Sequence, residues 1–174
     1  MALHFLVEIG KALDAIHIAG VVHRDLKPQN VMFRSDGSLA LVDFGVSKEL
    51  MDSHPLTRHG QVYGTPNYMS PEQAQGLPVD CRGDLYSLGV IFYELLTGTK
   101  PFRAPDPISM MHKHIYEPVP ALPPALGRFQ GLVDHLLAKK PEGRFANTKE
   151  MLDAVRHALN VQIPADEQKH ALAT

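Results

Sequence analysis

One apolar stretch near the middle of the chain, residues 84–97, constrains the fold most. Its apolar side chains surround the whole circumference of a helix, and Gly98 directly after it favours a helix end there. Such a helix must lie inside a core that the rest of the chain builds around it. The stretch is too short to span a bilayer, and its most apolar part, residues 85–96, contains the charged Glu94.

The rest of the chain is predicted to be mostly helical. Helical periodicity or helix boundary residues mark four further segments: 2–18, 107–116, 129–139 and 147–159. Two short apolar runs, 31–33 and 39–42, flank an Asp-Gly pair and predict a tight β-hairpin. We therefore expect a mostly α fold with one small hairpin over residues 1–160, followed by a polar tail over residues 161–174.

Residues 46–80 are expected to form a long loop. They are rich in Gly, Pro, Ser and His and show neither helical nor strand periodicity. Loops of this length in a compact domain are usually functional or disordered. The loop is therefore a candidate functional segment.

Charge and cysteine content exclude several classes of protein. Lysine and arginine number 17, and aspartate and glutamate 19, for a formal net charge of −2. Nucleic-acid binders that act by bulk charge carry a basic excess instead. The only cysteine, Cys81, excludes an internal disulfide framework and a Cys-x-x-Cys zinc site, and it is expected to be inert. We expect a protein of the reducing cytoplasm, with no nucleic acid partner and no membrane segment in this chain.

The 10 histidines raise the question of a metal site. Cysteine or carboxylate partners at ligand spacing are missing for His4, His17, His54 and His59. His112 and His114 alternate on a predicted surface helix, so they cannot share one face. A histidine metal site is therefore not favoured.

The chemically informative segment is residues 23–30, His-Arg-Asp-Leu-Lys-Pro-Gln-Asn, with a further aspartate, Asp43, after the hairpin. The hairpin is expected to bring Asn30 and Asp43 close together, which gives an oxygen pair for a hard cation such as Mg²⁺. Asp25 beside them could accept a proton, and Lys27 could offset charge developing on a phosphate. These are the parts of a phosphoryl-transfer site, although ordinary turn chemistry accounts for each residue taken singly.

Several segments, in order along the chain, resemble the protein kinase superfamily. Residues 23–30 match the catalytic-loop pattern H-R-D-L-x-x-x-N at every specified position, and residues 43–45 read Asp-Phe-Gly. The third signature, usually Ala-Pro-Glu, occurs as Ser-Pro-Glu at residues 70–72. The resemblance to bacterial-type serine/threonine protein kinases extends to three further segments, residues 64–73, 84–90 and 140–145.

The resemblance implies a chemical role for each matching residue. Asp25 would orient and deprotonate the substrate hydroxyl, and Lys27 would contact the γ-phosphate of ATP. Lys27 also favours serine and threonine over tyrosine as the hydroxyl acceptor on the protein substrate. Asn30 and Asp43 would bind Mg²⁺, with Mn²⁺ as an alternative, and Met32 would lie under the adenine.

Regulatory residues are implied in the same way. Arg24 would pair with a phosphate on the segment that follows the Asp-Phe-Gly motif. Thr57 is the best candidate for that phosphate, with Ser53 and Ser47 as alternatives. Thr65, in a Gly-Thr-Pro turn, would help position the substrate.

The remaining implied residues are structural. Glu72 and Arg144 would form a buried ion pair, so truncating either partner should cost about 3–5 kcal/mol. Asp84 would brace the catalytic loop. His23 would be a packed residue rather than a general base, and Phe44 would be structural.

All of the matching segments correspond to the C-terminal lobe of a kinase domain. A glycine-rich phosphate loop, a strand lysine and its partner glutamate do not occur in these 174 residues. We expect the chain alone to transfer phosphate at no useful rate. Three hypotheses remain: the catalytic lobe of a longer serine/threonine kinase, a non-catalytic docking or regulatory lobe, and one part of a split enzyme completed by a separate N-terminal lobe.

Overall fold

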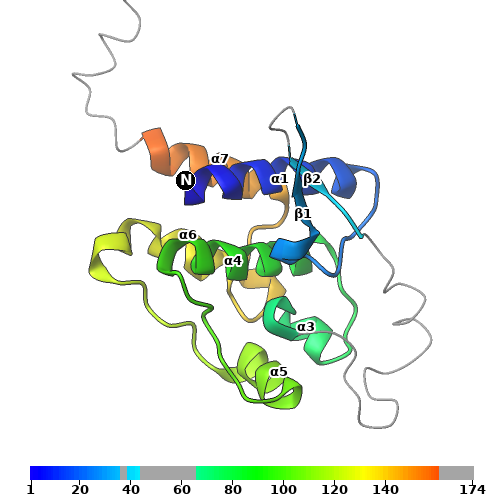
Figure 1. Ribbon diagram of the computed structural model, residues 1–174, viewed down its shortest axis with the longest axis vertical. Coiled ribbons are helices and arrows are strands. Elements are labelled where there is room, and N and C mark those ends of the chain that lie inside the picture. Colours follow the sequence, from blue (N-terminus) through cyan, green and yellow to red (C-terminus); the bar gives the residue numbers. More distant parts are fainter. Residues whose placement is uncertain (36–38, 44–65, 161–174) are drawn as a thin grey trace, which may run out of the picture.

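The computed structural model describes residues 1–35, 39–43 and 66–160, and this part is mostly helical (Figure 1). Its helices are α1 (Ala2–Ile18), α3 (Pro71–Ala74), α4 (Cys81–Thr97), α5 (Pro107–Tyr116), α6 (Gln130–Leu136) and α7 (Thr148–Asn160). The 3-10 helices are η1 (Pro28–Asn30), η2 (Pro66–Tyr68), η3 (Pro124–Phe129) and η4 (Pro141–Gly143). Two strands, β1 (Val31–Phe33) and β2 (Leu39–Leu41), complete the fold.

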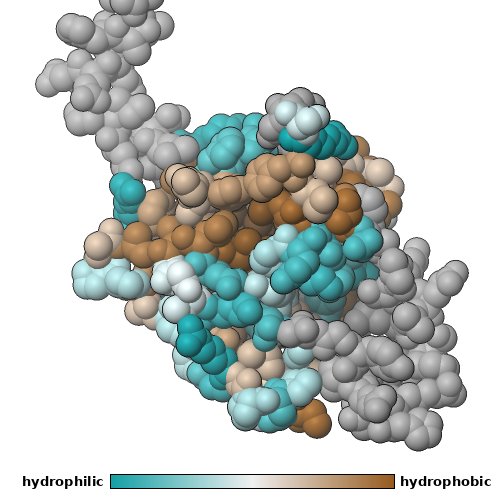
Figure 2. All heavy atoms as spheres, in the orientation of Figure 1, coloured by the Kyte–Doolittle hydropathy of each residue, from teal (hydrophilic) through white to brown (hydrophobic). Residues whose placement is uncertain are grey.

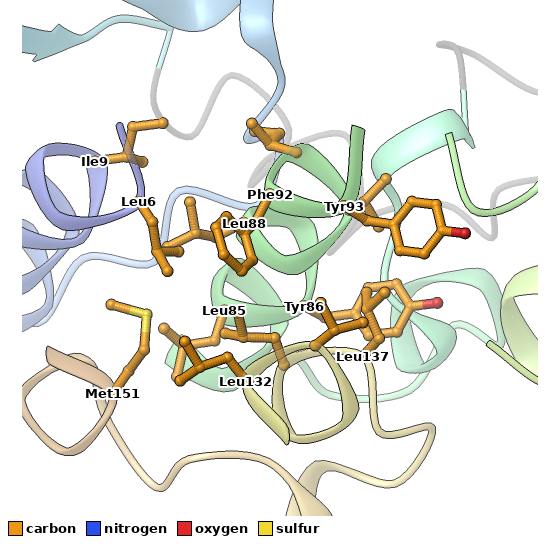
Figure 3. Packing of buried hydrophobic residues seen from close by; sticks show 14 of the residues in the cluster. Leu6, Ile9, Leu85, Tyr86, Leu88, Phe92, Tyr93, Leu132, Leu137 and Met151 are labelled. Atoms are coloured by element: carbon orange, nitrogen blue, oxygen red, sulfur yellow. The ribbon is translucent and has the colours of Figure 1, made fainter. Parts of the chain in front are cut away.

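Helix α4 forms the centre of the core, as its all-round apolarity predicts. Every residue from 83 to 93 is buried. Figure 1 shows α1 and α7 on one side of α4, and α3 and α5 on the other, with α6 alongside. Figure 3 shows Leu85, Leu88 and Phe92 of α4 surrounded by Leu6 and Ile9 of α1, Leu132 of α6 and Met151 of α7. Helix α4 therefore packs against α1, α6 and α7 through one shared hydrophobic core.

The predicted helix boundaries are correct at some ends and wrong at others. Helix α4 begins at Cys81 rather than at residue 84, because the Asp80 carboxylate accepts a hydrogen bond from the backbone N–H of Arg82 and caps the first turn. It ends at Gly98, whose φ of 73° suits glycine, as predicted. Helix α7 is capped by Asn147, whose side-chain oxygen accepts from the backbone N–H of Glu150. Helix α6 ends at Leu136 rather than at residue 139.

The prediction of one unbroken loop over residues 46–80 is wrong at its C-terminal end. This end contains η2 and the short helix α3, whose N-terminus carries a reciprocal cap between Ser70 and Gln73. A helix of four residues is too short to show helical periodicity, so the pattern could not reveal it. Outside the described residues lie Phe44, the candidate phosphate sites Ser47, Ser53 and Thr57, the substrate-positioning candidate Thr65, the hairpin turn and the predicted tail.

The predicted hairpin is present. Strands β1 and β2 pair antiparallel with Val31 opposite Leu41, Met32 opposite Ala40 and Phe33 opposite Leu39. Leu41 is buried, whereas Met32 and Phe33 are 52% and 59% exposed. Figure 2 shows apolar side chains gathered across α1 and the region between α1 and α4 on the face of the molecule that it displays.

No helix in the described part of the chain is long and apolar enough to cross a membrane.

Candidate active site

The turn between α1 and β1 carries the catalytic-loop candidates. Helix α1 ends where Gly20 takes a φ of 76°, and the backbone N–H of Val21 returns to the carbonyl of Ile16 at 2.9 Å. Leu26 is 1% exposed and ties the middle of the turn to the core. The polar residues on either side of Leu26 are thereby held at the surface next to the hairpin.

Asp25, Lys27 and Asn30 form one hydrogen-bonded group. Lys27 Nζ donates to Asp25 Oδ2 at 2.7 Å, and Asn30 Nδ2 donates to the same oxygen at 3.3 Å. Asn30 Nδ2 also donates to the backbone carbonyl of Asp25 at 2.9 Å. Both side-chain bonds use Oδ2, so Asp25 Oδ1 has no partner among the described residues. With 46% of its side chain exposed, Asp25 keeps one carboxylate oxygen available to a reactant.

The hairpin brings the backbone of Asn30 beside that of Val42, directly before Asp43. The N–H of Val42 donates to the carbonyl of Asn30 at 3.0 Å, which extends the strand pairing by one residue. Asn30 is 3% exposed, and Asp43 is exposed with a φ of 59°. The carboxamide of Asn30 and the carboxylate of Asp43 thus extend from neighbouring backbone positions at this end of the hairpin. Their oxygens are the ligand types that Mg²⁺ prefers, so the donor set fits this ion.

Asp84, in the first turn of α4, holds the backbone of the segment that carries the catalytic-loop candidates. Its Oδ1 accepts the backbone N–H of Arg24 at 2.8 Å, and its Oδ2 accepts that of His23 at 2.8 Å. Arg24 has a φ of 65°, a left-handed conformation that is unfavourable for a residue with a side chain. The buried carboxylate of Asp84 therefore holds the loop in a strained conformation next to Asp25.

His23 is packed inside the molecule, as expected. It is fully buried, and its Nδ1 accepts the backbone N–H of Asp25 at 3.3 Å. Its Nε2 lies 3.1 Å from the carbonyl of Val42, so the neutral tautomer with the proton on Nε2 satisfies both contacts. The imidazole thus links the catalytic loop to the end of β2.

Two other histidines depart from the sequence-based interpretation. His17 does have a carboxylate partner, because its Nε2 lies 2.8 Å from Asp84 Oδ2 and its Nδ1 lies 2.9 Å from Thr148 Oγ1. His114 is not on a surface face of α5 but is fully buried, 3.0 Å from the hydroxyl of Tyr86. In both cases the partner is far away in sequence, so spacing could not reveal the contact.

The predicted ion pair between Glu72 and Arg144 is present and buried. The guanidinium nitrogens donate to Glu72 Oε1 at 2.7 Å and to Oε2 at 2.8 Å, and the two side chains are 6% and 0% exposed. Arg144 also donates to the backbone carbonyls of Arg82, Ala138 and Lys139. These bonds satisfy all of its N–H groups, which a buried guanidinium requires.

The electrostatics of Cys81 agree with an inert thiol. Cys81 is the first residue of α4, a position that can lower a thiol pKa. Burial raises the pKa of this thiol instead, and the carboxylates of Asp80 and Asp84 add to the effect. These surroundings disfavour the thiolate, the form in which a cysteine acts as a nucleophile.

The chain is similar to known serine/threonine kinases over almost its whole length. Residues 1–158 match a family model described as protein kinase domain. The chain is 39% identical over 175 residues to a probable serine/threonine-protein kinase of Clostridium acetobutylicum, covering 95% of this chain and 26% of the relative. It is 41% identical over 155 residues to the serine/threonine-protein kinase PknA of Mycobacterium tuberculosis, covering 88% and 36%.

A third relative agrees with these two. The probable serine/threonine-protein kinase PknB of Corynebacterium glutamicum is 34% identical over 183 residues, covering 95% of this chain and 28% of that protein. The chain therefore spans about a quarter to a third of the length of these curated relatives.

Proposed function

Because the chain belongs to the protein kinase family, and by family to its serine/threonine kinases, we propose that it is the C-terminal lobe of a serine/threonine protein kinase catalytic domain. The lobe would comprise residues 1–160, with residues 161–174 as a tail. The complete enzyme would transfer the γ-phosphoryl group of ATP to serine or threonine hydroxyls of protein substrates. The missing N-terminal lobe would come from the same gene or from a separate chain.

The observation that carries this proposal is the state of Asp25. Its carboxylate is fixed through Oδ2 by Lys27 and Asn30, while much of the side chain stays exposed. Such a group can accept the proton of a substrate hydroxyl and orient its oxygen toward a phosphorus atom. Lys27 carries three N–H donors, so it can hold Asp25 and contact a γ-phosphate oxygen at the same time.

Asn30 and Asp43 are the proposed ligands of Mg²⁺ or Mn²⁺. When bound, the ion would offset the negative charge of the ATP phosphates. The hydrogen bonds that Asn30 Nδ2 donates to Asp25 set the orientation of the carboxamide, which leaves its oxygen for the metal. Met32, exposed on β1, is the proposed contact of the adenine.

The proposed regulation involves residues partly outside the described part of the chain. Arg24 is the proposed partner of a phosphate on Thr57, Thr65 the proposed substrate-positioning residue, and Phe44 a packed residue of the Asp-Phe-Gly motif. The position of Arg24 next to Asp25 supports a connection between such a phosphate and the catalytic loop.

The proposal is tested by phosphate transfer from labelled ATP to casein. The complete gene product that contains this chain should be active, and Asp25→Asn should lower the rate by about 10²–10⁴-fold. Asp134→Asn, the same change at an exposed position of α6, should leave the rate unchanged. Equal rates for Asp25→Asn and the unaltered protein would favour the non-catalytic docking lobe instead.

The isolated 174-residue chain is a separate arm of the same test. We expect it to transfer no phosphate at a useful rate, since the exposed Met32 would leave the adenine covered on one side only. Robust transfer that Asp25→Asn abolishes would contradict this expectation. Activity that appears only when a separately expressed N-terminal lobe is added would establish the split enzyme.

A further inference from the structure

The peptide group between Arg24 and Asp25 is held from both of its sides. Its N–H, which belongs to Asp25, donates to His23 Nδ1 at 3.3 Å. Its carbonyl, which belongs to Arg24, accepts from Gln73 Nε2 at 2.6 Å. The orientation of this peptide sets ψ of Arg24 and φ of Asp25, and thus the direction in which the Asp25 side chain leaves the backbone.

The orientation of the Gln73 amide follows from the chemistry of its neighbours. Gln73 Oε1 accepts the backbone N–H of Ser70 at 3.0 Å and the Ser70 hydroxyl at 3.1 Å. A backbone N–H can only donate, and the Arg24 carbonyl can only accept. The amide therefore presents its oxygen to Ser70 and its nitrogen to Arg24, and a flipped amide would lose both contacts.

Gln73 is itself fixed by the surroundings of α3. It is 4% exposed, and Ser70, which caps the helix, is fully buried. The preceding residue, Glu72, is held by the bidentate contact with Arg144. The amide that contacts the catalytic loop thus extends from a short helix that is fixed at its N-terminus and along its length.

We propose that Gln73 is a positioning residue for Asp25, acting through the carbonyl of Arg24. Asp84 holds the N–H of Arg24, and Gln73 holds its carbonyl, so the left-handed conformation of Arg24 is maintained from two helices at once. Loss of the Gln73 contact leaves the partly buried carbonyl of Arg24 without this donor and allows the peptide to rotate. This inference rests on the proposed function, because Asp25 is taken as the catalytic base.

Gln73→Glu separates the two contacts of this side chain. Glutamate is nearly the same size and can still accept from Ser70, so the cap of α3 is kept. Toward Arg24 it presents an acceptor instead of a donor. The matched control is Gln75→Glu, the same change on the exposed residue that follows α3. The Gln75 side-chain amide donates to the carbonyl of Pro71, the first residue of the helix.

Ser70→Ala is the second control. It weakens the cap of α3 but leaves the contact between Gln73 and Arg24. If Gln73 served only to cap the helix, Gln73→Glu would leave Arg24 and Asp25 unchanged, because this variant keeps the cap. A positioning role predicts that Gln73→Glu changes the conformation of Arg24 and that Ser70→Ala does not.

The first readout is NMR of the 174-residue chain, which requires no activity. The backbone carbon shifts of Arg24 should indicate the left-handed conformation in the unaltered chain, in Gln75→Glu and in Ser70→Ala. In Gln73→Glu they should move away from it, and the Asp25 amide should exchange faster with solvent. Unchanged Arg24 shifts and Asp25 exchange in a folded Gln73→Glu chain would overturn the proposal.

The second readout is the phosphate transfer of the complete gene product. Gln73→Glu should lower kcat by about tenfold or more, with KM for ATP within about twofold of the unaltered value, because a misplaced base affects the chemical step. Gln75→Glu should change neither constant, and an unchanged kcat in Gln73→Glu would overturn the proposal. If the unaltered product transfers no phosphate, the proposed function fails, and the NMR result still decides whether Gln73 holds the peptide.

Discussion

The site has two regions that use the same kinds of charge in opposite environments. The buried charge cluster behind the catalytic loop consists of Glu72, Asp84 and Arg144, whose side chains are 6%, 1% and 0% exposed. The exposed edge consists of Asp25, Lys27 and Asp43, of which the first two are 46% and 34% exposed. Both regions contain a carboxylate in contact with a cation at 2.7 Å.

The difference shows how one small fold separates stability from chemistry. A charge removed from water must be fully paired, so the buried cluster tolerates one geometry only. At the exposed edge, water replaces a lost partner at little cost, so Lys27 and Asp25 are free to separate, as their proposed contacts with reactants require. Changes in the buried cluster should therefore affect folding first, and changes at the edge should affect catalysis alone.

The largest effect is expected at the buried ion pair. Arg144→Met should lower the free energy of unfolding by about 3–5 kcal/mol, because Glu72 is left buried without its partner. Urea denaturation measures this loss. Arg156→Met is the matched control, since Arg156 pairs with Asp153 on the surface, and it should cost less than about 1 kcal/mol. A loss below 1 kcal/mol for Arg144→Met would show that burial does not set the strength of the pair.

The second effect is a loss of stability in acid that arises from His114. Burial lowers the pKa of His114 to about 4 from the usual 6.5, and the nearby charge of Lys139 contributes. The unfolded chain therefore binds this proton at a higher pH than the folded one. The stabilisation is complete above pH 6.5 and is lost as the pH falls from 6.5 to 4, by about 3 kcal/mol in total.

Urea denaturation between pH 7 and pH 4 measures this contribution. His114→Phe should remove that part of the pH dependence, whereas His112→Phe, on the exposed face of the same helix, should leave it unchanged. The assignment to His114 is wrong if the two variants show the same pH profile.

The third effect is steric and lies next to the ion pair. A Cβ at Gly83 would be 2.6 Å from Val79 Cγ1 and 3.2 Å from Glu72 Oε1. Gly83→Ala should therefore destabilise by about 1–3 kcal/mol. A Cβ at Gly131 in α6 would meet nothing within 4 Å, so Gly131→Ala should stabilise by about 0.5–1 kcal/mol. Thermal denaturation measures the change in stability of each variant. An unchanged stability of Gly83→Ala would show that α4 can shift to admit the methyl group.

The smallest effect on stability is expected at the exposed edge. Lys27→Met should change the free energy of unfolding by less than about 1 kcal/mol, because the pair with Asp25 is partly hydrated. In the complete gene product the same change should lower kcat by about 10²-fold or more, since a cation that contacts the phosphate is lost. Parallel urea and phosphate-transfer measurements test this separation. A large loss of stability would place Lys27 with the buried cluster instead.

The sequence predicts the centre of the fold and the chemical groups of the site well. Residues 84–97 are apolar on all sides, and this pattern has one outcome in a chain of this size, a buried helix. The hairpin follows from two apolar runs on either side of a turn signal. The pair between Glu72 and Arg144 was predictable because the resemblance aligned both residues at once.

Two kinds of contact are not predicted by the sequence. The first joins residues that are distant in the chain, and the second involves an element too short to show a periodic pattern. His17 and Asp84 are 67 positions apart, and no spacing rule connects them. His114 shares α5 with exposed neighbours, so only the packing of Tyr86 and Phe102 against it reveals its burial. Gln73 belongs to a helix of one turn, and its contact with Arg24 depends on how that turn is placed.

The separation between Glu72 and Arg144 also has a consequence for biosynthesis. Arg144 lies 72 residues after Glu72, so at about 5–20 residues per second a ribosome needs roughly 4–14 s to add it. During that interval α4 is synthesised. The Glu72 carboxylate, which is buried in the folded protein, still lacks its cationic partner. Because burial of an unpaired charge is costly, we expect Glu72 to stay in water until Arg144 has been added.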